Sequence, residues 1–399
     1  MAATRTIVIA GAGIGGLTAA LAIAAKGFRV VVLEKAERLE EAGAGLQLSP
    51  NATRILIELG LKERLAARAV TPDAISIMSA QRGGEIARLP LGEAAGLRAG
   101  APYWVLHRAD LQAALQAEVD DNPDIELRLG CRFEDVVSRE DGVTIIQRSG
   151  VTREQESALA LIGADGVWSA VRHRLFPHIQ PQFSGLIAWR GTLEASQLPG
   201  EITSQRVQLW MGSNAHLVAY PISGGRRINM VAILPGTWNR PDWSADGDPS
   251  EITTAFTSRQ WPAAARLKIG AVEGWRKWAL FTVSTGNNWS SGAVTLLGDA
   301  AHAMLPFAAQ GAGMAIEDAA VLAKCLAGGG DNVAAIPLAL KRYAGLRRMR
   351  VARVQRMARL NGKIYHLSGA AAFARDLVIR TLGSERMMGR QDWIYHWRA

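Results

Sequence analysis

The chain has 399 residues, of which 49% are hydrophobic and 20% charged, and it contains no low-complexity tract. This composition excludes a disordered protein, and the length favours two domains that share an interface. The formal net charge is +9, but eight basic residues and no acidic ones lie within residues 341–359. A helix with a solvated basic face explains this segment, with an anionic membrane or partner surface as the alternative, so we expect no nucleic-acid partner.

Cysteine use and the N-terminal segment limit the cellular context. Cys131 and Cys325 are far apart in the sequence, and no His cluster has metal-ligand spacing. We therefore expect a cytoplasmic protein with no disulfide framework and no metal site. Residues 6–25 carry no charge and have the length of a membrane span, but four glycines lie within residues 11–16. A strand, a glycine turn and a helix explain these features better, so we expect no integral membrane segment.

The first 35 residues have the pattern of a βαβ unit. TIVIAG (6–11) is typical of a buried parallel strand, LTAALAIAAKG (17–27) of a helix, and FRVVVLEK (28–35) of the next strand. The turn between the first strand and the helix satisfies GxGxxG, and Glu34 ends the second strand. Such glycines let the backbone approach a pyrophosphate at a helix N-terminus, while the carboxylate accepts from a ribose hydroxyl. The segment therefore predicts dinucleotide binding.

The remaining elements follow in chain order. SPNATRILIELG (49–60) predicts a helix capped by Ser49, and RADLQAALQAEV (108–119) predicts another. ALALIGAD (158–165) and GAVTLLGD (292–299) indicate further buried strands that each end in an Asp. Eight of the 12 tryptophans lie between Trp189 and Trp289, among runs such as RVQLWMG, HLVAYPI and RRINMVAIL that alternate like antiparallel strands. The pattern after Ala320 is helical to the end.

Three features occur in a distinctive order along the chain. They are the N-terminal GxGxxG, the segment Ala164-Asp165-Gly166, and Gly298-Asp299 followed by the uncharged loop within GDAAHAMLPFAAQGAGMAIEDAA (298–320). Together they resemble the flavoprotein monooxygenases of the para-hydroxybenzoate hydroxylase fold, over essentially the whole chain. The likeness is strongest to single-component aromatic hydroxylases such as salicylate hydroxylase, 3-hydroxybenzoate 6-hydroxylase and 6-hydroxynicotinate 3-monooxygenase. The other segments that carry it are GAGLQLSPNATRIL, LHRADL, GADGVWSAVR, GLIAWRG, HLVAYPI and DWIYHW.

The resemblance implies an α/β fold. It consists of a Rossmann-like FAD-binding domain, an inserted and mainly antiparallel β-sheet substrate domain, and a helical C-terminal region. We expect the FAD-binding domain to be built from three parts, the substrate domain from two, and the helical region from the end of the chain. The expected bounds are 1–71, 101–180 and 276–340 for the first, 72–100 and 181–275 for the second, and 341–399 for the third.

The resemblance also implies a set of FAD contacts. Arg108 is expected near the phosphates, where a guanidinium suits phosphate geometry, and Asp299 near the ribitol or pyrophosphate. A helix beginning in the glycines after Pro306 would point its N-terminus at the flavin and stabilise negative charge on the reduced ring. Asp165 has the alternative role of capping a turn, and His302 is expected to be structural. The expected cofactor residues are Gly11, Gly13, Ile14, Gly15, Gly16, Glu34, Lys35, Gln47, Arg108, Asp165, Asp299, Pro306, Gly311, Ala312 and Gly313.

His216 and Tyr220 are the expected catalytic residues. They are four apart in HLVAYPI, so a strand would point both toward one sheet face. In the relatives, a His and a Tyr at matching positions face the aromatic substrate. The resemblance therefore implies that His216 takes a phenolic proton and that Tyr220 hydrogen-bonds the substrate, with ordinary sheet packing as the alternative.

The implied enzyme is an NAD(P)H- and FAD-dependent monooxygenase of aromatic compound catabolism. It would hydroxylate a small phenolic or hydroxy-heteroaromatic acid with O₂ through a flavin 4a-hydroperoxide. Gln47 replaces a His of the 6-hydroxynicotinate enzymes and Pro306 a Gln of the 3-hydroxybenzoate 6-hydroxylases, so neither substrate is carried over. The choice of NADH or NADPH, the ring position and a homodimer stay open. The alternatives are a related flavoprotein oxygenase acting on a quinone precursor, polyene or antibiotic, and a non-catalytic FAD-binding sensor.

Overall fold

The computed structural model describes residues 5–39, 45–198, 205–240, 242–259, 261–286, 288–328 and 332–399. Gly43 and Ala44, the first two residues of the segment GAGLQLSPNATRIL, lie outside these ranges. Among the helices of the described ranges, none combines the length and the apolar character that crossing a bilayer requires.

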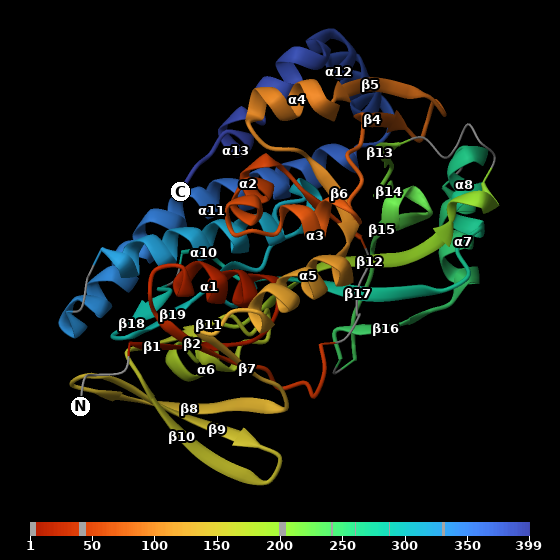
Figure 1. Cartoon of the computed structure of the whole chain (residues 1–399). Helices are drawn as coiled ribbons and strands as arrows, with labels where there is room; N and C mark the ends of the chain where they lie inside the picture. The colour runs from red at the N-terminus through yellow and green to blue at the C-terminus, as the bar shows by residue number, and fades with distance from the viewer. Residues whose placement is uncertain are drawn as a thin grey trace.

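A six-stranded sheet forms the base of the nucleotide-binding part (Figure 1). All five residues of β1 are buried, as expected for a central parallel strand covered on both faces. The strands β7, β2, β1, β11 and β19 run parallel, and β18 adds an antiparallel edge. In spatial order the sheet consists of β18 (Ser290–Ser291), β19 (Val294–Leu296), β11 (Ala160–Gly163), β1 (Thr6–Ala10), β2 (Arg29–Leu33) and β7 (Ile125–Arg128).

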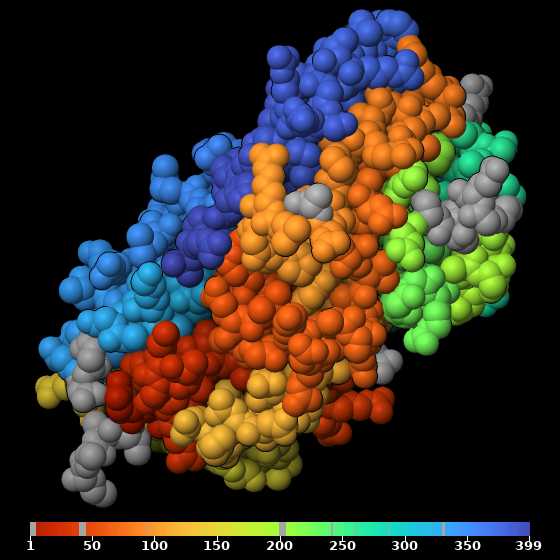
Figure 2. All heavy atoms as spheres, turned by 45° about the horizontal axis from the view of Figure 1, so that its top comes forward, coloured from red at the N-terminus to blue at the C-terminus, as the bar shows by residue number. Residues whose placement is uncertain are grey.

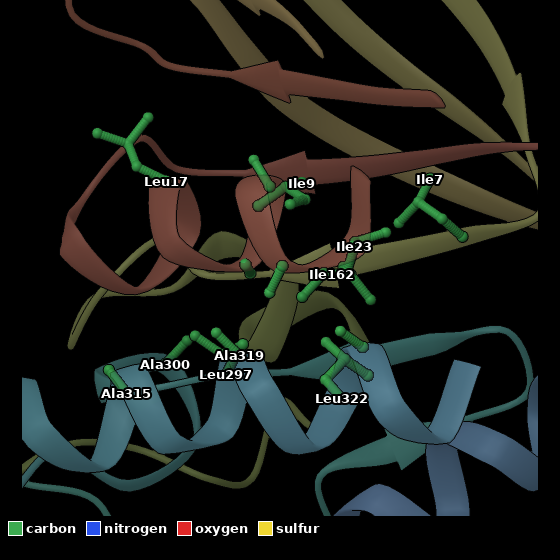
Figure 3. Close-up of a cluster of buried hydrophobic side chains, with 14 of the residues drawn as sticks. Ile7, Ile9, Leu17, Ile23, Ile162, Leu297, Ala300, Ala315, Ala319 and Leu322 are labelled. Carbon is green, nitrogen blue, oxygen red and sulfur yellow. The ribbon is translucent and has the colours of Figure 1, made fainter. Parts of the chain in front are cut away.

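Helices α1 (Ile14–Ala24) and α10 (Gly311–Ala327) pack against each other beside this sheet. Figure 3 shows Ile23 of α1 and Leu322 of α10 within the shared hydrophobic core. The two helices come very close at Gly15, where a Cβ would lie 3.2 Å from Cβ of Ala315. Small residues at this crossing therefore bring the N-termini of both helices to the same region. Helix α5 (Arg108–Asp120) also contacts α1.

An eight-stranded sheet forms the second part of the molecule. It is antiparallel except for the β13–β4 pair, which confirms the expected mainly antiparallel insertion. Helices α7 (Pro249–Ser258) and α8 (Ala263–Gly270) cover one face of it with a tryptophan-rich core. In spatial order its strands are β16 (Ser244–Gly247), β17 (Trp275–Thr282), β12 (Gln182–Glu194), β15 (Arg227–Pro235), β14 (Ala215–Ile222), β13 (Arg206–Gly212), β4 (Ala74–Ser79) and β5 (Glu85–Pro90).

Strand β17 extends beyond residue 275, where we expected the substrate domain to end. The eight-stranded sheet therefore continues into residues 276–340, which we expected to belong to the FAD-binding domain. A separate three-stranded sheet, which the sequence patterns do not predict, lies at the opposite end of the molecule from α12 (Figure 1). Its strands are β8 (Cys131–Arg139), β9 (Gly142–Ser149) and β10 (Thr152–Ala158). Shorter elements are β3 (Gly45–Leu48), α2 (Pro50–Glu58), α3 (Lys62–Ala66), α4 (Gly92–Ala99), β6 (Trp104–His107), α6 (Ala170–Leu175) and α9 (Asp299–His302).

The C-terminal region is helical, as expected. It consists of α11 (Ile336–Tyr365), α12 (Gly369–Gly389) and α13 (Asp392–Tyr395). Figures 1 and 2 show α12 at one end of the molecule beside β4 and β5. Oγ of Ser79 in β4 donates to Oδ2 of Asp376 in α12 over 2.9 Å, which fixes the helix to the sheet.

The basic segment on α11 is largely solvated as expected, with Lys341, Arg342, Arg353, Arg356 and Arg359 exposed, but two of its arginines turn to buried carboxylates instead. Arg347 is only 1% exposed, and its Nε donates to Oδ1 of Asp318 over 2.6 Å. Arg350 donates to both oxygens of the buried Glu317 over 2.7 Å. The charge-free loop before Glu317 ends on two buried carboxylates, and these need cations from another element because an unpaired buried charge is costly.

Candidate active site

The glycines of GxGxxG divide into two groups. Gly11 has a φ of +106°, and a Cβ on Gly16 would lie 1.9 Å from the carbonyl oxygen of Gly11. These two positions are therefore closed to any side chain by the backbone itself. A Cβ on Gly13 would meet nothing within 4 Å, because this residue faces open space at the start of α1. Ile14 and Gly15 line the same cavity as Gly13, although a Cβ on Gly15 would lie 2.8 Å from Cδ2 of Leu297, and Gly16 packs inside the turn.

A cavity of about 570 Å³, the first cavity, lies between the ends of β1, β2 and β11. Glu34 lies on its wall, where one carboxylate oxygen accepts from the backbone N–H of Ala12 over 2.8 Å and the other from Ala36 over 3.0 Å. These bonds hold the carboxylate in place while leaving lone pairs for a ribose hydroxyl. The other lining residues include Gly11, Gly13, Lys35, Cys131, Arg132, Phe133, Asp165 and Trp168.

Asp165 caps a helix and also lines the first cavity. Its Oδ2 accepts from the backbone N–H groups of Ala170 and Val171 at the start of α6, over 2.7 and 3.1 Å. Within the described part of the chain, its Oδ1 is buried without a hydrogen-bond partner. Burial raises the pKa of this carboxyl above its usual value, since desolvation disfavours the charged form. The capping role and the cavity position are thus compatible.

A second cavity, of about 310 Å³, lies between the starts of α1 and α10 and one face of the eight-stranded sheet. Asp299 is exposed on its wall at the start of α9. Helix α10 begins at Gly311, and Gly311 and Ala312 line the cavity. Gly313 does not line it: a Cβ there would lie 3.0 Å from Oε1 of Gln310, inside a buried polar network.

That network holds the loop between Gly298 and Glu317. Asp318 accepts from the backbone N–H of Gly298 over 3.1 Å and pairs with Nε2 of His302 at 2.6 Å. Asn51 donates to Glu317 over 2.7 Å, and Gln310 donates to Ser49 over 2.8 Å. His302 is fully buried in this network, as the structural role expected for it requires.

Two arginines line the second cavity. Arg108, an expected phosphate contact, is the first residue of α5 and is exposed toward the cavity. Arg190 extends from β12, and its Nε is buried with no hydrogen-bond partner among the residues the structure describes. Burial lowers the pKa of this guanidinium. Sequence reasoning assigned no role to Arg190, although the segment GLIAWRG that contains it was part of the resemblance.

A third cavity, of about 540 Å³, lies between the eight-stranded sheet, the end of α11 and α12. His216 of β14 lines both this cavity and the second one, and it is 2% exposed. Its Nδ1 lies 2.7 Å from Nε2 of His366, and its ring packs edge-on against Phe307 and Tyr365. Burial first, and the neighbouring His366 second, lower the pKa of His216 well below 6.5. Its imidazole is therefore neutral at neutral pH.

The other expected residues lie on the same boundary or in the second cavity. Pro306 and Gln47 line both the second and third cavities, and Oε1 of Gln47 accepts from the Tyr103 hydroxyl over 2.7 Å. Tyr220 shares the sheet face of His216 but lines only the second cavity. Burial raises the pKa of the Tyr220 hydroxyl, with Arg190 acting in the opposite direction.

Together these features define a dinucleotide-binding fold whose extended ligand site ends against a separate apolar cavity. A family model described as "FAD binding domain" matches residues 4–358. The chain therefore belongs to this family, and its cofactor is FAD. The residues present fit this cofactor: Gly13 leaves open space at a helix N-terminus, Glu34 presents a fixed carboxylate to the first cavity, and Arg108 and Arg190 line the second.

Curated relatives match along almost the whole chain. A 3-amino-4-hydroxybenzoate 2-monooxygenase from Streptomyces platensis is 38% identical over 98% of this chain and 96% of its own length. A 3-hydroxybenzoate 6-hydroxylase from Klebsiella oxytoca is 33% identical over 100% of this chain and 98% of its own length. A 6-hydroxynicotinate 3-monooxygenase from Bordetella bronchiseptica is 33% identical over 89% of this chain and 91% of its own length. These matches confirm the predicted resemblance and place the chain among the FAD-dependent monooxygenases.

Solved structures confirm the fold. A salicylate hydroxylase substrate complex superposes with a TM-score of 0.82 at 24% identity, covering 98% of this chain and 95% of that one. Klebsiella pneumoniae HpxO complexed with FAD and uric acid superposes with a TM-score of 0.80 at 23% identity, covering 98% and 96%. At this level of identity the likeness concerns the fold alone.

Proposed function

We propose that the protein uses NADH or NADPH and O₂ to hydroxylate a phenolic ring held in the third cavity. The observation that carries this proposal is the position of His216, whose side chain borders both the second and the third cavity. A ring bound there lies next to the region that the start of α10 and the glycine loop of α1 assign to the flavin. The curated relatives, named as hydroxylases and monooxygenases of hydroxylated aromatic acids, support the same reaction class.

When bound, FAD supplies the redox chemistry with the nicotinamide and O₂. The protein binds FAD through the α1 glycine turn, Glu34 and the two arginines of the second cavity. The start of α10, with no acidic residue in its first turn, places positive helix-end charge beside the flavin region. The mainly aliphatic wall of the third cavity excludes water from the ring.

In this proposal His216 is the general base that accepts the phenolic proton. Nδ1 is engaged with His366, and Nε2 carries no hydrogen bond to any other described residue. When Nδ1 donates to Nε2 of His366, Nε2 of His216 is left as an acceptor for the phenolic hydroxyl. Removing that proton increases electron density on the ring, which favours attack by an electrophilic oxygen. Tyr220, which faces the second cavity, is the second polar group on this sheet face.

The test is turnover of the FAD-loaded protein with a panel of phenols, hydroxybenzoates and hydroxynicotinates. We expect aromatic substrates to stimulate NADH or NADPH oxidation and to gain one oxygen atom by mass. Stimulated oxidation that yields hydrogen peroxide alone for every compound would contradict hydroxylation. Retained FAD without any stimulation would favour the sensor alternative.

A further inference from the structure

The third cavity is much larger than a single aromatic ring. Its volume is about 540 Å³, whereas an apolar cavity of about 150 Å³ is sufficient to bind benzene. A hydroxybenzoate placed against His216 would leave most of this space unfilled. The unfilled part lies away from the second cavity, toward α12.

The wall of this outer part is aliphatic on both sides. Ile77, Leu209 and Met211 face it from the eight-stranded sheet, and Ala374, Ile379 and Met388 face it from α12. The hydrogen bond between Ser79 and Asp376 fixes the position of α12 relative to the sheet, and this position defines the width of the cavity between them. An aliphatic wall stabilises an apolar ligand group and offers nothing to a polar one.

The charged side chains on this wall are either paired with an opposite charge or exposed to solvent. Nε and Nη2 of Arg375 donate to Oδ1 of Asp376 over 2.9 and 2.8 Å, and Nη1 donates to the carbonyl of Ile364 over 3.1 Å. The other charged residue among the described ones that line the cavity is Arg390, which is exposed. A carboxylate deep in the cavity would therefore be desolvated without a free cation, which is unfavourable.

We propose that the substrate is a phenol whose ring carries an apolar substituent of several carbons, and that this substituent lies between the sheet and α12. The ring end of this arrangement rests on the proposed function. The substituent end rests only on the size and lining of the third cavity. The proposal replaces the expected substrate class, a small aromatic acid, with a larger and mainly apolar phenol.

Equilibrium binding to the FAD-loaded full-length protein tests this without requiring turnover. The probes are phenol, 3- and 4-ethylphenol, 3- and 4-butylphenol, 3- and 4-hexylphenol, and 3-hydroxybenzoate, measured by calorimetry and by flavin absorbance. In at least one of the two series, we expect affinity to increase by about fourfold per buried methylene, or about two-hundredfold from phenol to butylphenol. We expect 3-hydroxybenzoate to bind more weakly than the butylphenol. Affinity independent of chain length, or tightest for 3-hydroxybenzoate, overturns the proposal.

Two substitutions on α12 locate the substituent. Ala374 and Ala370 are both exposed residues of this helix, but only Ala374 lines the cavity. Ala374→Trp should reduce the affinity for hexylphenol by tenfold or more and change that for phenol by less than twofold. Ala370→Trp, the matched control, should change neither by more than twofold. Val378→Trp, on the same cavity wall, provides a second variant with the same expected loss.

The outcomes separate the two proposals. Chain-length-dependent binding that the Trp variants abolish, without hydroxylation of any phenol, would support the substituent site and contradict the proposed function. Hydroxylation of phenols with no chain-length dependence would support the proposed function and overturn the substituent site. If the chain-length dependence of the affinity persists in both Ala374→Trp and Val378→Trp, the alkyl group binds elsewhere. This result also overturns the proposed substituent site.

Discussion

Nδ1 of His216 lies 2.7 Å from Nε2 of His366, so two imidazoles 150 residues apart in the sequence share one hydrogen bond. His216 belongs to β14, and His366 follows the last residue of α11. Burial lowers the pKa of His366 to about 4 and that of His216 well below 6.5. Both rings are neutral near pH 7, so one nitrogen of the pair donates and the other accepts. In the proposed function, His366 is therefore a positioning residue that fixes the tautomer of His216.

Replacing His366 tests this role. His366→Leu removes the partner of Nδ1, and we expect coupled hydroxylation to fall about tenfold because His216 no longer has a single tautomer. FAD content and the affinity for a phenol should stay unchanged. His366→Gln retains a polar group near the Nε2 position and should recover most of the activity. The change in ultraviolet absorbance on binding reports phenol ionisation, and it should decrease only in the Leu variant. Equal losses in both variants would contradict the positioning role.

The pH dependence of hydroxylation follows from the lowered pKa of His216. In the proposed function His216 accepts a proton as the neutral imidazole, so activity is lost as the pH falls through the pKa of this group. Because burial and His366 lower that pKa, the loss should occur well below pH 6.5. We expect kcat/KM for coupled hydroxylation to be flat from about pH 8 to pH 6.5. An acid limb centred at or above pH 6.5 would show that another group controls the profile.

Gly13 and Gly16 predict two different defects. A Cβ on Gly16 collides with the carbonyl oxygen of Gly11, so Gly16→Ala should destabilise even the FAD-free protein by about 3 kcal/mol. A Cβ on Gly13 meets no protein atom but enters the space assigned to the pyrophosphate. Gly13→Ala should therefore leave the apoprotein's melting temperature unchanged and weaken FAD binding tenfold or more. Fluorescence titration with FAD measures this, and wild-type affinity in Gly13→Ala would place the pyrophosphate elsewhere.

Local patterns were sufficient to predict the elements that hold the cofactor. The strand before Gly11, the helix after it and the strand ending at Glu34 all form close to the expected bounds, because a buried parallel strand is a short continuous apolar run. The sheet of β8, β9 and β10 was not predicted. Its strands mix buried and exposed polar residues, and their stability depends on pairing that no single segment reveals.

The site was predictable only where its residues lie in motifs. His216, Asp299 and Gly311 lie in segments that resemble known relatives, and the structure brings all three to the second cavity. His366 had no such signal, because it touches His216 only through the packing of α11 against the sheet. Arg347 was read as part of a solvated basic face, since its buried carboxylate partners lie on another helix. Contacts between distant segments are what the sequence patterns leave out.

Arg347 predicts a large loss of stability on substitution. Its Nη1 lies 2.7 Å from Oε2 of Glu317, and all three side chains of the Glu317, Asp318 and Arg347 cluster are at most 1% exposed. Arg347→Met leaves part of this negative charge uncompensated and should lower the free energy of unfolding by about 3–5 kcal/mol. Arg356→Ala, at an exposed position of the same helix, should change it by less than about 0.5 kcal/mol. Urea unfolding of both variants decides this, and similar stabilities would contradict the network.

Lys268 is a buried cation outside the cofactor and substrate sites. It is 2% exposed on α8, and its Nζ donates to Oε1 of Gln208 over 2.5 Å and lies 5.6 Å from the ring centre of Trp210. Burial lowers its pKa from 10.5 to about 8. Nε1 of Trp210 donates to the same oxygen of Gln208 over 3.1 Å, so this acceptor keeps a partner when Lys268 is removed.

Lys268→Met should therefore stabilise the protein at neutral pH. The unfolded state binds the lysine proton more tightly than the folded state, so the lysine's contribution to folding becomes more favourable as the pH rises from about 8 to 10.5. Below pH 8 the folded protein holds a buried charge, and replacing it by a side chain of similar length should raise the free energy of unfolding by about 1–3 kcal/mol. The gain over wild type should shrink as the pH rises toward 10.5. Urea unfolding of both FAD-saturated proteins at neutral and at alkaline pH measures it, and a pH-independent difference would show that Lys268 is not buried as a cation.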